Sequence, residues 1–150
     1  MEAVRRTLYD FCREYISLRS SRLRNNMSGM MESLESETKS SAGDKHETGR
    51  AMIQLELEKL GNQLAEIQKL EEQFKKVSQT SGNDTISLGS VVHTDMQYYY
   101  IAISAGAVAL ENTTYYAIAP NSPIGMLLMG KKVGASFSFN GKKITITAIG

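Results

Sequence analysis

Two acidic side chains, three positions apart, carry the clearest chemical signal in this sequence of 150 residues. Asp44 and Glu47 belong to the run Gly43-Asp44-Lys45-His46-Glu47. Residues three positions apart on a helix project from the same side. Two carboxylates placed in this way can hold a hard cation such as Mg²⁺, which takes one or two protein carboxylates and keeps several waters. They do not complete a tight site, so we expect a partner to supply the remaining ligands.

The acidic pair also fits a structural role. An Asp at the start of a helix, followed three residues later by Glu, is a capping arrangement, and negative charge stabilises a helix N-terminus. Capping and metal binding are compatible with each other. His46, which lies between the acids, could ligate a metal or buffer a proton, but an isolated exposed histidine is usually a solvated surface residue.

Other reactive side chains have ordinary interpretations. Cys12 is the only cysteine, so it cannot form an internal disulfide, and this agrees with a reducing cytoplasm. Both histidines fall in other segments, and a nucleophilic cysteine needs a nearby base. We therefore expect Cys12 to be a structural thiol. Residues 98–100 are three tyrosines, which ordinary strand composition explains better than a surface that stacks on bases. The sequence contains no phosphate loop, zinc motif or catalytic triad.

Two helical segments are expected to position the acidic pair. Apolar residues recur at steps of three and four, which is the heptad pattern of a coiled-coil seam. The first seam, with one skipped residue near Arg22, consists of Val4, Leu8, Phe11, Tyr15, Leu18, Leu23, Met27, Met30 and Leu34. The second seam consists of Ile53, Leu57, Leu60, Leu64, Ile67, Leu70, Phe74 and Val77.

The polar stretch 35–50 separates the two seams, and its glycines and serines predict a turn. We therefore expect residues 1–80 to form a long antiparallel α-helical coiled-coil hairpin with arms of about 45–55 Å. Its acidic tip would lie at residues 40–50. Because the hairpin pairs its own seams, we expect a monomer, although a dimer through the coiled coil stays open.

The second half of the chain has a different composition. Residues 1–80 carry 13 basic and 13 acidic side chains, whereas residues 81–150 carry four and three. The polar segment 78–84 predicts a linker. After it, β-branched and aromatic residues predict strands, at 86–95, 97–104 and 108–119. Residues 136–148 predict a hairpin that turns at Asn140-Gly141.

A short helix is predicted at residues 122–130, with Ser122 as its N-cap, Pro123 at its first position and Gly130 as its stop. The second module, residues 81–150, would then be a small sheet with one helix packed on it. The fold class is therefore α+β.

Composition and charge exclude several classes of protein. Net charge is +1, whereas a strong nucleic-acid binder shows a basic excess. No apolar run reaches the 18–20 residues or so of a membrane span, and no secretory signal is present, so we expect a cytoplasmic protein without membrane contact. Six arginines near the N-terminus could contact RNA or an acidic protein surface, although a solvated helix face is slightly favoured. They are Arg5, Arg6, Arg13, Arg19, Arg22 and Arg24.

The sequence resembles the bacterial Gre-type transcript cleavage factors, the GreA/GreB family, in both halves and in the same order. The acidic run Gly43-Asp44-x-x-Glu47 resembles the tip of those factors. The motifs of the second half resemble the Gre C-terminal domain; they are Gly89-Ser90, Asn121-Ser122-Pro123-Ile124, Leu128-x-Gly130-Lys131 and Gly134.

This resemblance implies a coiled-coil N-terminal domain and an FKBP-like C-terminal domain. In that family the globular domain docks on RNA polymerase, and the coiled coil enters the secondary channel. The acidic tip then helps to hold the second Mg²⁺ near the 3′ end of the nascent RNA and to orient a water, and the polymerase hydrolyses the backtracked RNA. Asp44 and Glu47 would be that pair, sharing Mg²⁺ only when docked, and DNA would be near only through the polymerase. The chain would then be an accessory factor rather than an enzyme.

The resemblance also gives the C-terminal motif a role in structure or in polymerase docking. The residues concerned are Ser122, Pro123, Ile124, Gly130 and Lys131. Two departures from the family pattern are visible. Thr48-Gly49-Arg50-Ala51 follows the acidic pair where the family has Asn, Ala, Glu and Tyr, and Gly134-Ala135 replaces a Gly-Asp pair. Two alternatives therefore stay open: a Gre-like channel regulator or inhibitor without cleavage activity, and a coiled-coil adaptor for another protein.

Overall fold

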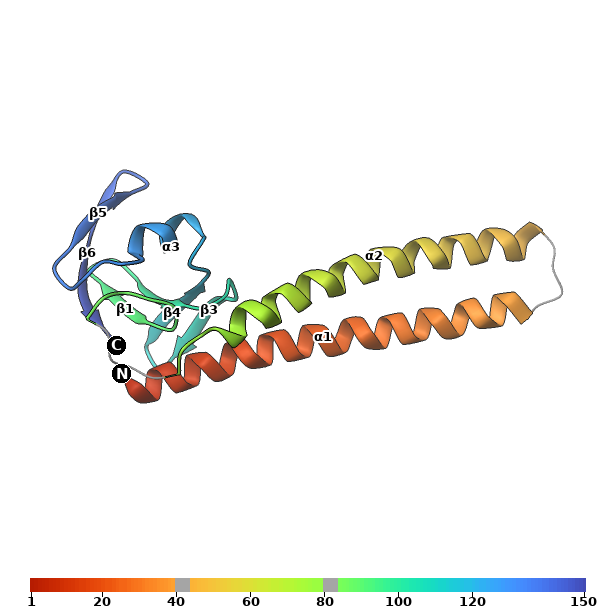
Figure 1. The fold of residues 1–150 in the computed structure, drawn as a ribbon, viewed down its shortest axis with the longest axis horizontal. Helices are drawn as coiled ribbons and strands as arrows, with labels where there is room; N and C mark the ends of the chain where they lie inside the picture. Colours follow the sequence, from red (N-terminus) through yellow and green to blue (C-terminus); the bar gives the residue numbers. More distant parts are fainter. Residues whose placement is uncertain (40–43, 80–83) are drawn as a thin grey trace. The chain divides into compact units, whose positions relative to one another are not determined.

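The computed structural model describes residues 1–39, 44–79 and 84–150, with side chains described outside 38–39 and 44–47. Two long helices, α1 (Glu2–Lys39) and α2 (Asp44–Lys75), precede a six-stranded mixed sheet and one short helix, α3 (Pro123–Leu128), as Figure 1 shows. The strands are β1 (Val91–Thr94), β2 (Tyr98–Ile101), β3 (Gly106–Leu110), β4 (Thr113–Ile118), β5 (Ser136–Phe139) and β6 (Lys142–Ile149). The α+β class is confirmed.

Contacts divide the chain into two compact units. Unit 1 combines Met1–Tyr15 with Glu72–Gly150, and unit 2 is Ile16–Glu71. The modules 1–80 and 81–150 were inferred from composition, whereas the contacts group the beginning of α1 and the end of α2 with the sheet. One such contact joins Cys12 of α1 to the backbone of Ile103.

In unit 2 the two helices pack against each other as an antiparallel hairpin. Ile16, Leu60 and Ile67 are buried in the seam between them. The predicted seam is wrong at Leu18, whose side chain is 58% exposed. The buried side is instead followed by Leu8, Cys12 and Ile16, at steps of four residues. Ser20 continues this row as a buried residue and half-buried Leu23 follows three positions later, so the row passes Arg22 at helical steps without a skipped residue.

The interruption predicted over residues 35–50 is too wide. Helix α1 continues to Lys39 and α2 already begins at Asp44. The polar residues at these helix ends include Glu and Lys, which are good helix formers, so polarity alone did not end either helix. Residues 40–43, the centre of the predicted turn, lie outside the described residues.

The sheet of unit 1 has the strand order β3-β4-β2-β1-β6-β5. Strands β2 and β4 are parallel, and the other neighbours are antiparallel. The single strand predicted at 108–119 is wrong, because the chain turns after Leu110 and pairs β3 with β4. Glu111 adopts a positive φ of 55° at this turn.

The predicted Asn-Gly turn is confirmed. Strands β5 and β6 pair from Phe139↔Lys142 onward, and Asn140 and Gly141 have φ of 52° and 77°. Positive φ at both central residues is what a type I′ turn requires, and Asn and Gly tolerate it best.

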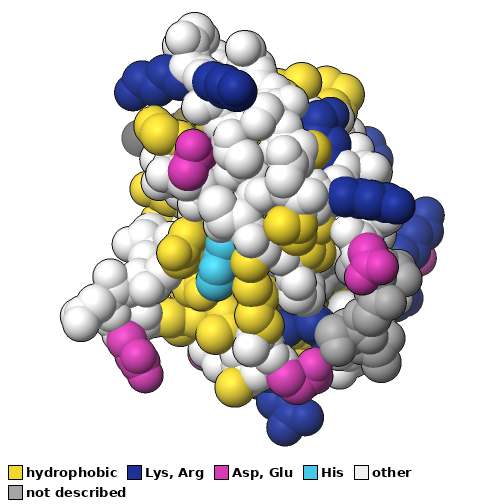
Figure 2. Space-filling view, turned by 90° about the vertical axis from the view of Figure 1, so that its left-hand side faces the viewer, with side chains coloured by type: hydrophobic (Ala, Val, Ile, Leu, Met, Phe, Trp, Pro, Cys, Tyr) yellow, Lys and Arg dark blue, Asp and Glu magenta, His cyan; other side chains and the backbone are white. Residues whose placement is uncertain are grey.

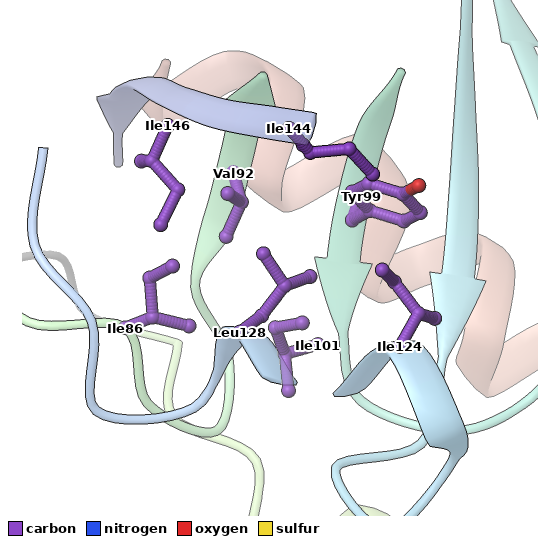
Figure 3. Packing of buried hydrophobic residues seen from close by; sticks show 8 residues of the cluster. All are labelled: Ile86, Val92, Tyr99, Ile101, Ile124, Leu128, Ile144 and Ile146. Atoms are coloured by element: carbon purple, nitrogen blue, oxygen red, sulfur yellow. The ribbon is translucent and has the colours of Figure 1, made fainter. Parts of the chain in front are cut away.

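Helix α3 covers one face of the sheet, and the hydrophobic core lies between the helix and that face (Figure 3). Ile124 and Leu128 project from α3 toward side chains of β1, β2 and β6. The cluster consists of Ile86, Val92, Tyr99, Ile101, Ile124, Leu128, Ile144 and Ile146. Alternate side chains of a strand face opposite sides, so Tyr100 turns away from this cluster. Its hydroxyl lies close enough to Cys12, Tyr9 and Arg5 of α1 for these groups to affect its pKa, after burial, which raises it most. Both faces of β2 are therefore covered.

Candidate functional site

The acidic pair occupies the first turn of helix α2. Asp44 is the first residue of this 32-residue helix, and Glu47 follows three residues later. The prediction that both acids begin the second helix is confirmed for the backbone. The side chains of Asp44, His46 and Glu47 are outside the described residues, as is Gly43. Metal binding by the pair therefore stays a prediction.

A helix N-terminus adds to what two carboxylates can do. The unpaired N–H groups of the first turn create a positive potential, which favours the ionised form of nearby acids. Among the side chains that the structure describes, no group of three or more acids, histidines or cysteines is placed to hold a metal ion. Two carboxylates by themselves leave most positions around a Mg²⁺ ion to water or to a partner.

A third carboxylate lies close to the first turns of α2. An ideal Cβ atom built on Gly49 would be 3.4–3.5 Å from the side-chain carboxyl atoms of Glu37. Glu37 belongs to α1, and Gly49 is two residues after Glu47. Sequence reasoning missed Glu37, because only the register between the two helices brings it to Gly49. Its carboxylate adds negative charge near the acidic end of the hairpin.

Gly49 is predicted to weaken the hairpin rather than to be required by it. The substitution Gly49→Ala should raise the free energy of unfolding by about 1 kcal/mol, because alanine has the higher helix propensity. A contact of 3.4 Å to the end of the Glu37 side chain is an ordinary one. Urea unfolding followed by circular dichroism measures the change.

Gly61→Ala is the matched control, because nothing lies within 4 Å of a Cβ atom at this helical position. Both substitutions should stabilise the protein to a similar extent. A loss of stability in Gly49→Ala beside a gain in Gly61→Ala would show that the contact with Glu37 does not tolerate a methyl group.

The predicted cap of helix α3 is confirmed. Ser122 Oγ accepts a hydrogen bond from the Gly125 N–H at 3.1 Å, and it donates one to the Ala119 carbonyl oxygen at 2.6 Å. Pro123 is in the first turn. Gly125 allows this tight arrangement, since a Cβ atom there would overlap the Ala119 carbonyl oxygen. Ser122 and Pro123 thus set the start of the helix.

The other motif residues connect α3 to the rest of the sheet domain. Ile124 is buried in the core. Gly130, with a φ of 81°, donates from its N–H to the Ile86 carbonyl oxygen at 2.9 Å. The Lys131 carbonyl oxygen accepts from the Ile86 N–H at 2.8 Å, and its ammonium lies 5.8 Å from the centre of the Phe137 ring. All five motif residues therefore have structural contacts, and docking by them stays a prediction.

Helix α3 also exposes an apolar side chain that sequence reasoning did not single out. Met126 is 63% exposed. It lies three residues after Pro123, which is also exposed, so the two share a side of the helix. A protein partner that docks on α3 would meet this pair first.

The base of α1 is structural. Arg5 is only 2% exposed, and its Nη1 donates to Glu2 at 3.3 Å and to the Gln79 carbonyl oxygen at 3.5 Å. The sequence had suggested that six arginines could contact RNA or an acidic protein surface. Buried Arg5 is not available for such a contact.

Cys12 is fully buried, and burial raises the pKa of its thiol to about 12. The expected structural thiol is confirmed, because a completely buried thiol in apolar surroundings is unreactive.

Three aromatic residues form a cluster on the sheet that sequence reasoning missed. The rings of His93 and Tyr98 are stacked at 3.9 Å, and His93 Nε2 is 3.2 Å from the Tyr115 hydroxyl. Figure 2 shows a histidine among hydrophobic side chains on one face of the molecule. His93 pairs with Tyr98 across β1 and β2, but Tyr115 joins through the parallel β2–β4 pairing, which the sequence did not reveal.

His93 is predicted to make stability depend on pH. Burial lowers the pKa of its imidazole below the ordinary value of 6.5, and the N-terminal ammonium lowers it further. The unfolded chain therefore binds the proton more tightly than the folded one. The stability that neutral His93 contributes to the folded protein is fully present above about pH 6.5, and it is lost as the pH falls toward the pKa of His93 in the folded protein. Wild-type protein should thus lose stability relative to His93→Gln between pH 7.5 and 5.5, as measured by urea unfolding. A stability difference that does not change with pH would contradict this prediction.

No protein-family model and no curated protein matches this chain. Among the described helices, none is long and apolar enough to cross a membrane.

Proposed function

We propose that this chain is a Gre-type transcription elongation factor, which binds bacterial RNA polymerase in the cytoplasm and stimulates cleavage of backtracked nascent RNA. The observation that carries the proposal is the place of Asp44 and Glu47 in the first turn of α2, at the end of a helical hairpin. The hairpin is followed by an α+β module that contains the motif residues of a Gre C-terminal domain. We assign an FKBP-like fold to this module.

The acidic pair would act as an incomplete metal site. Asp44 and Glu47 would share a Mg²⁺ ion with the polymerase and the RNA, which supply the missing ligands. In two-metal phosphoryl transfer the two cations together would stabilise the attacking and the leaving oxygens. Water would attack the phosphorus of the RNA backbone, and the bond to the 3′ oxygen of the preceding nucleotide would break. The polymerase performs this hydrolysis, so the factor is not an enzyme by itself.

The lengths of the helices support this role. Helix α1 has 38 residues and α2 has 32, which correspond to about 57 and 48 Å at 1.5 Å per residue. A hairpin of such helices has a narrow cross-section, which suits entry into a channel toward a buried active centre. The C-terminal module would dock at the mouth of the channel, with the exposed side of α3 as its first candidate surface.

A second candidate is a channel-binding regulator that does not stimulate cleavage. Thr48-Gly49-Arg50-Ala51 departs from the family pattern directly after the acidic pair. Glu37 beside Gly49 further changes the charge of this end of the hairpin. These features affect the chemistry of the tip more than the docking of the C-terminal module.

A cleavage assay separates the candidates. Purified protein is added with Mg²⁺ to a backtracked elongation complex of bacterial RNA polymerase, and shortening of the RNA from its 3′ end is followed. A cleavage factor accelerates shortening. Slower nucleotide addition without faster shortening identifies the channel regulator. If neither rate changes and the protein does not bind polymerase, the proposed function is wrong and the adaptor alternative takes its place.

A further inference from the structure

One side of the helical hairpin in unit 2 carries an open apolar groove of about 920 Å³. Side chains of both helices line it, and charged residues of α1 are among them. The apolar lining consists of Met27, Met31, Leu34, Leu57 and Leu64. Two long helices therefore leave apolar surface between them that neither helix covers.

The exposed fractions of the apolar side chains also show that the groove is less well covered than the rest of the seam. Ile16, Leu60 and Ile67 are 5–7% exposed. In contrast, Met31 in the groove is 60% exposed, and the other four apolar residues of the lining are only half-buried. Large exposed apolar patches on soluble proteins mark interaction surfaces. The groove is thus a surface that fits an apolar partner.

Three charged residues of α1 line the groove, Arg24, Glu32 and Glu35, and the first two lie symmetrically about one residue. Arg24 and Glu32 both line it, and so does Ser28 midway between them. Arg24 is four residues before Ser28, and Glu32 is four residues after it. These residues therefore form a row along one side of α1, with the opposite charges about 6 Å on either side of Ser28.

We propose that a second copy of this chain closes the groove, with the two α1 helices antiparallel about a two-fold axis at Ser28. In a two-fold interface the same patch meets itself. Arg24 of each copy then lies opposite Glu32 of the other, and the apolar linings of the two grooves cover each other. The Arg24 and Glu32 pair favours a second copy over an unrelated helix, because it is complementary to itself, and Glu35 would face the uncharged Ser21 of the other copy.

The small side chain at the axis lets the helices approach each other. Packed helices have axes about 8–10 Å apart, and the Cα atoms lie about 2.3 Å from each axis. The two Ser28 Cα atoms would then be about 4–5 Å apart across the axis. Gly29 follows Ser28, and nothing lies within 4 Å of the position that a Cβ atom would take there.

This inference revises the expectation of a monomer, which rested on the hairpin pairing its own seams. It does not rest on the proposed role in transcription, and the dimer would have to dissociate before one hairpin enters the channel. Self-association is measured on the purified chain alone, so its failure and the failure of the cleavage assay are distinguishable.

Charge reversal tests the two-fold arrangement. Sedimentation equilibrium should show a reversible dimer for the wild-type chain. Arg24→Glu and Glu32→Arg, each alone, place like charges opposite each other twice per dimer and should raise the dissociation constant by about 10–100-fold. The double variant restores opposite pairs and should restore the wild-type dissociation constant. A wild-type monomer at all accessible concentrations overturns the proposal, and so does a double variant that is no better than the single ones.

Cysteine crosslinking tests the position of the axis. Cα atoms about 4–5 Å apart are within the range that a disulfide spans. Ser28→Cys should therefore form an intermolecular disulfide on mild oxidation. Ser17→Cys is the matched control, since Ser17 is exposed on the same helix but does not line the groove. Native Cys12 is buried. Equal crosslinking at both positions, or stronger crosslinking at residue 17, overturns the proposed axis.

Discussion

Replacing Asp44 by Asn together with Glu47 by Gln is expected to abolish stimulated cleavage of backtracked RNA, a loss of about 10²-fold or more in the stimulated rate. The amides keep the size of both side chains and the ability to accept a hydrogen bond at the start of α2. They remove both negative charges, and with them the affinity for Mg²⁺. The measurement is the rate of RNA shortening in the elongation complex, at saturating factor.

This pair of substitutions distinguishes metal binding from helix capping. If the acids only cap α2, the amide variant keeps its cleavage activity, because Asn is as good a cap as Asp. Glu58→Gln is the matched control, since Glu58 is an exposed acid further along the same helix. It should leave the cleavage rate unchanged. Binding to polymerase, measured separately, should survive in both variants because the C-terminal module is untouched.

Truncating Leu128 to Ala is expected to lower the free energy of unfolding by about 2–5 kcal/mol. Leu128 is fully buried in the cluster between α3 and the sheet. The substitution removes three carbon atoms, one methine and two methyl groups, and leaves a cavity that the surrounding isoleucines fill only in part. Urea unfolding measures the loss, and the melting temperature should fall by several degrees.

Met126→Ala is the control for Leu128, because it shortens an exposed side chain on the same helix. Its effect on stability should stay within about 0.5 kcal/mol. If polymerase docks on the exposed side of α3, this variant loses affinity for polymerase without losing stability. Equal stability losses in both variants would contradict the described packing of α3.

Local physics made several features predictable. The apolar periodicity indicated two long helices, and Ser122-Pro123 indicated the start of α3, because a cap and a fixed proline φ act within one turn. Asn140-Gly141 indicated the turn between β5 and β6 for the same reason. The place of Asp44 and Glu47 in the first turn of α2 was also predictable, since a run of polar residues beside Gly43 preceded a clear helical pattern.

Other features depended on packing between distant residues. The sequence at 108–119 looked like one strand, but pairing with β2 and a turn at Glu111 made it a hairpin. His93, Tyr98 and Tyr115 meet only because β2 and β4 run parallel, 17 residues apart in sequence for each paired position. A hydrophobic pattern does not specify which strands become neighbours.

The sequence by itself determined the helical hairpin, its acidic end and the small sheet module that follows, because periodicity, caps and turns act over a few residues. The tertiary structure decided which side chains are buried. It placed Ile16 rather than Leu18 in the seam, buried Arg5, and brought Glu37 next to Gly49. These outcomes depend on the register between the helices and on contacts with the sheet. Such contacts join residues that are far apart in the sequence, so a local sequence pattern does not reveal them.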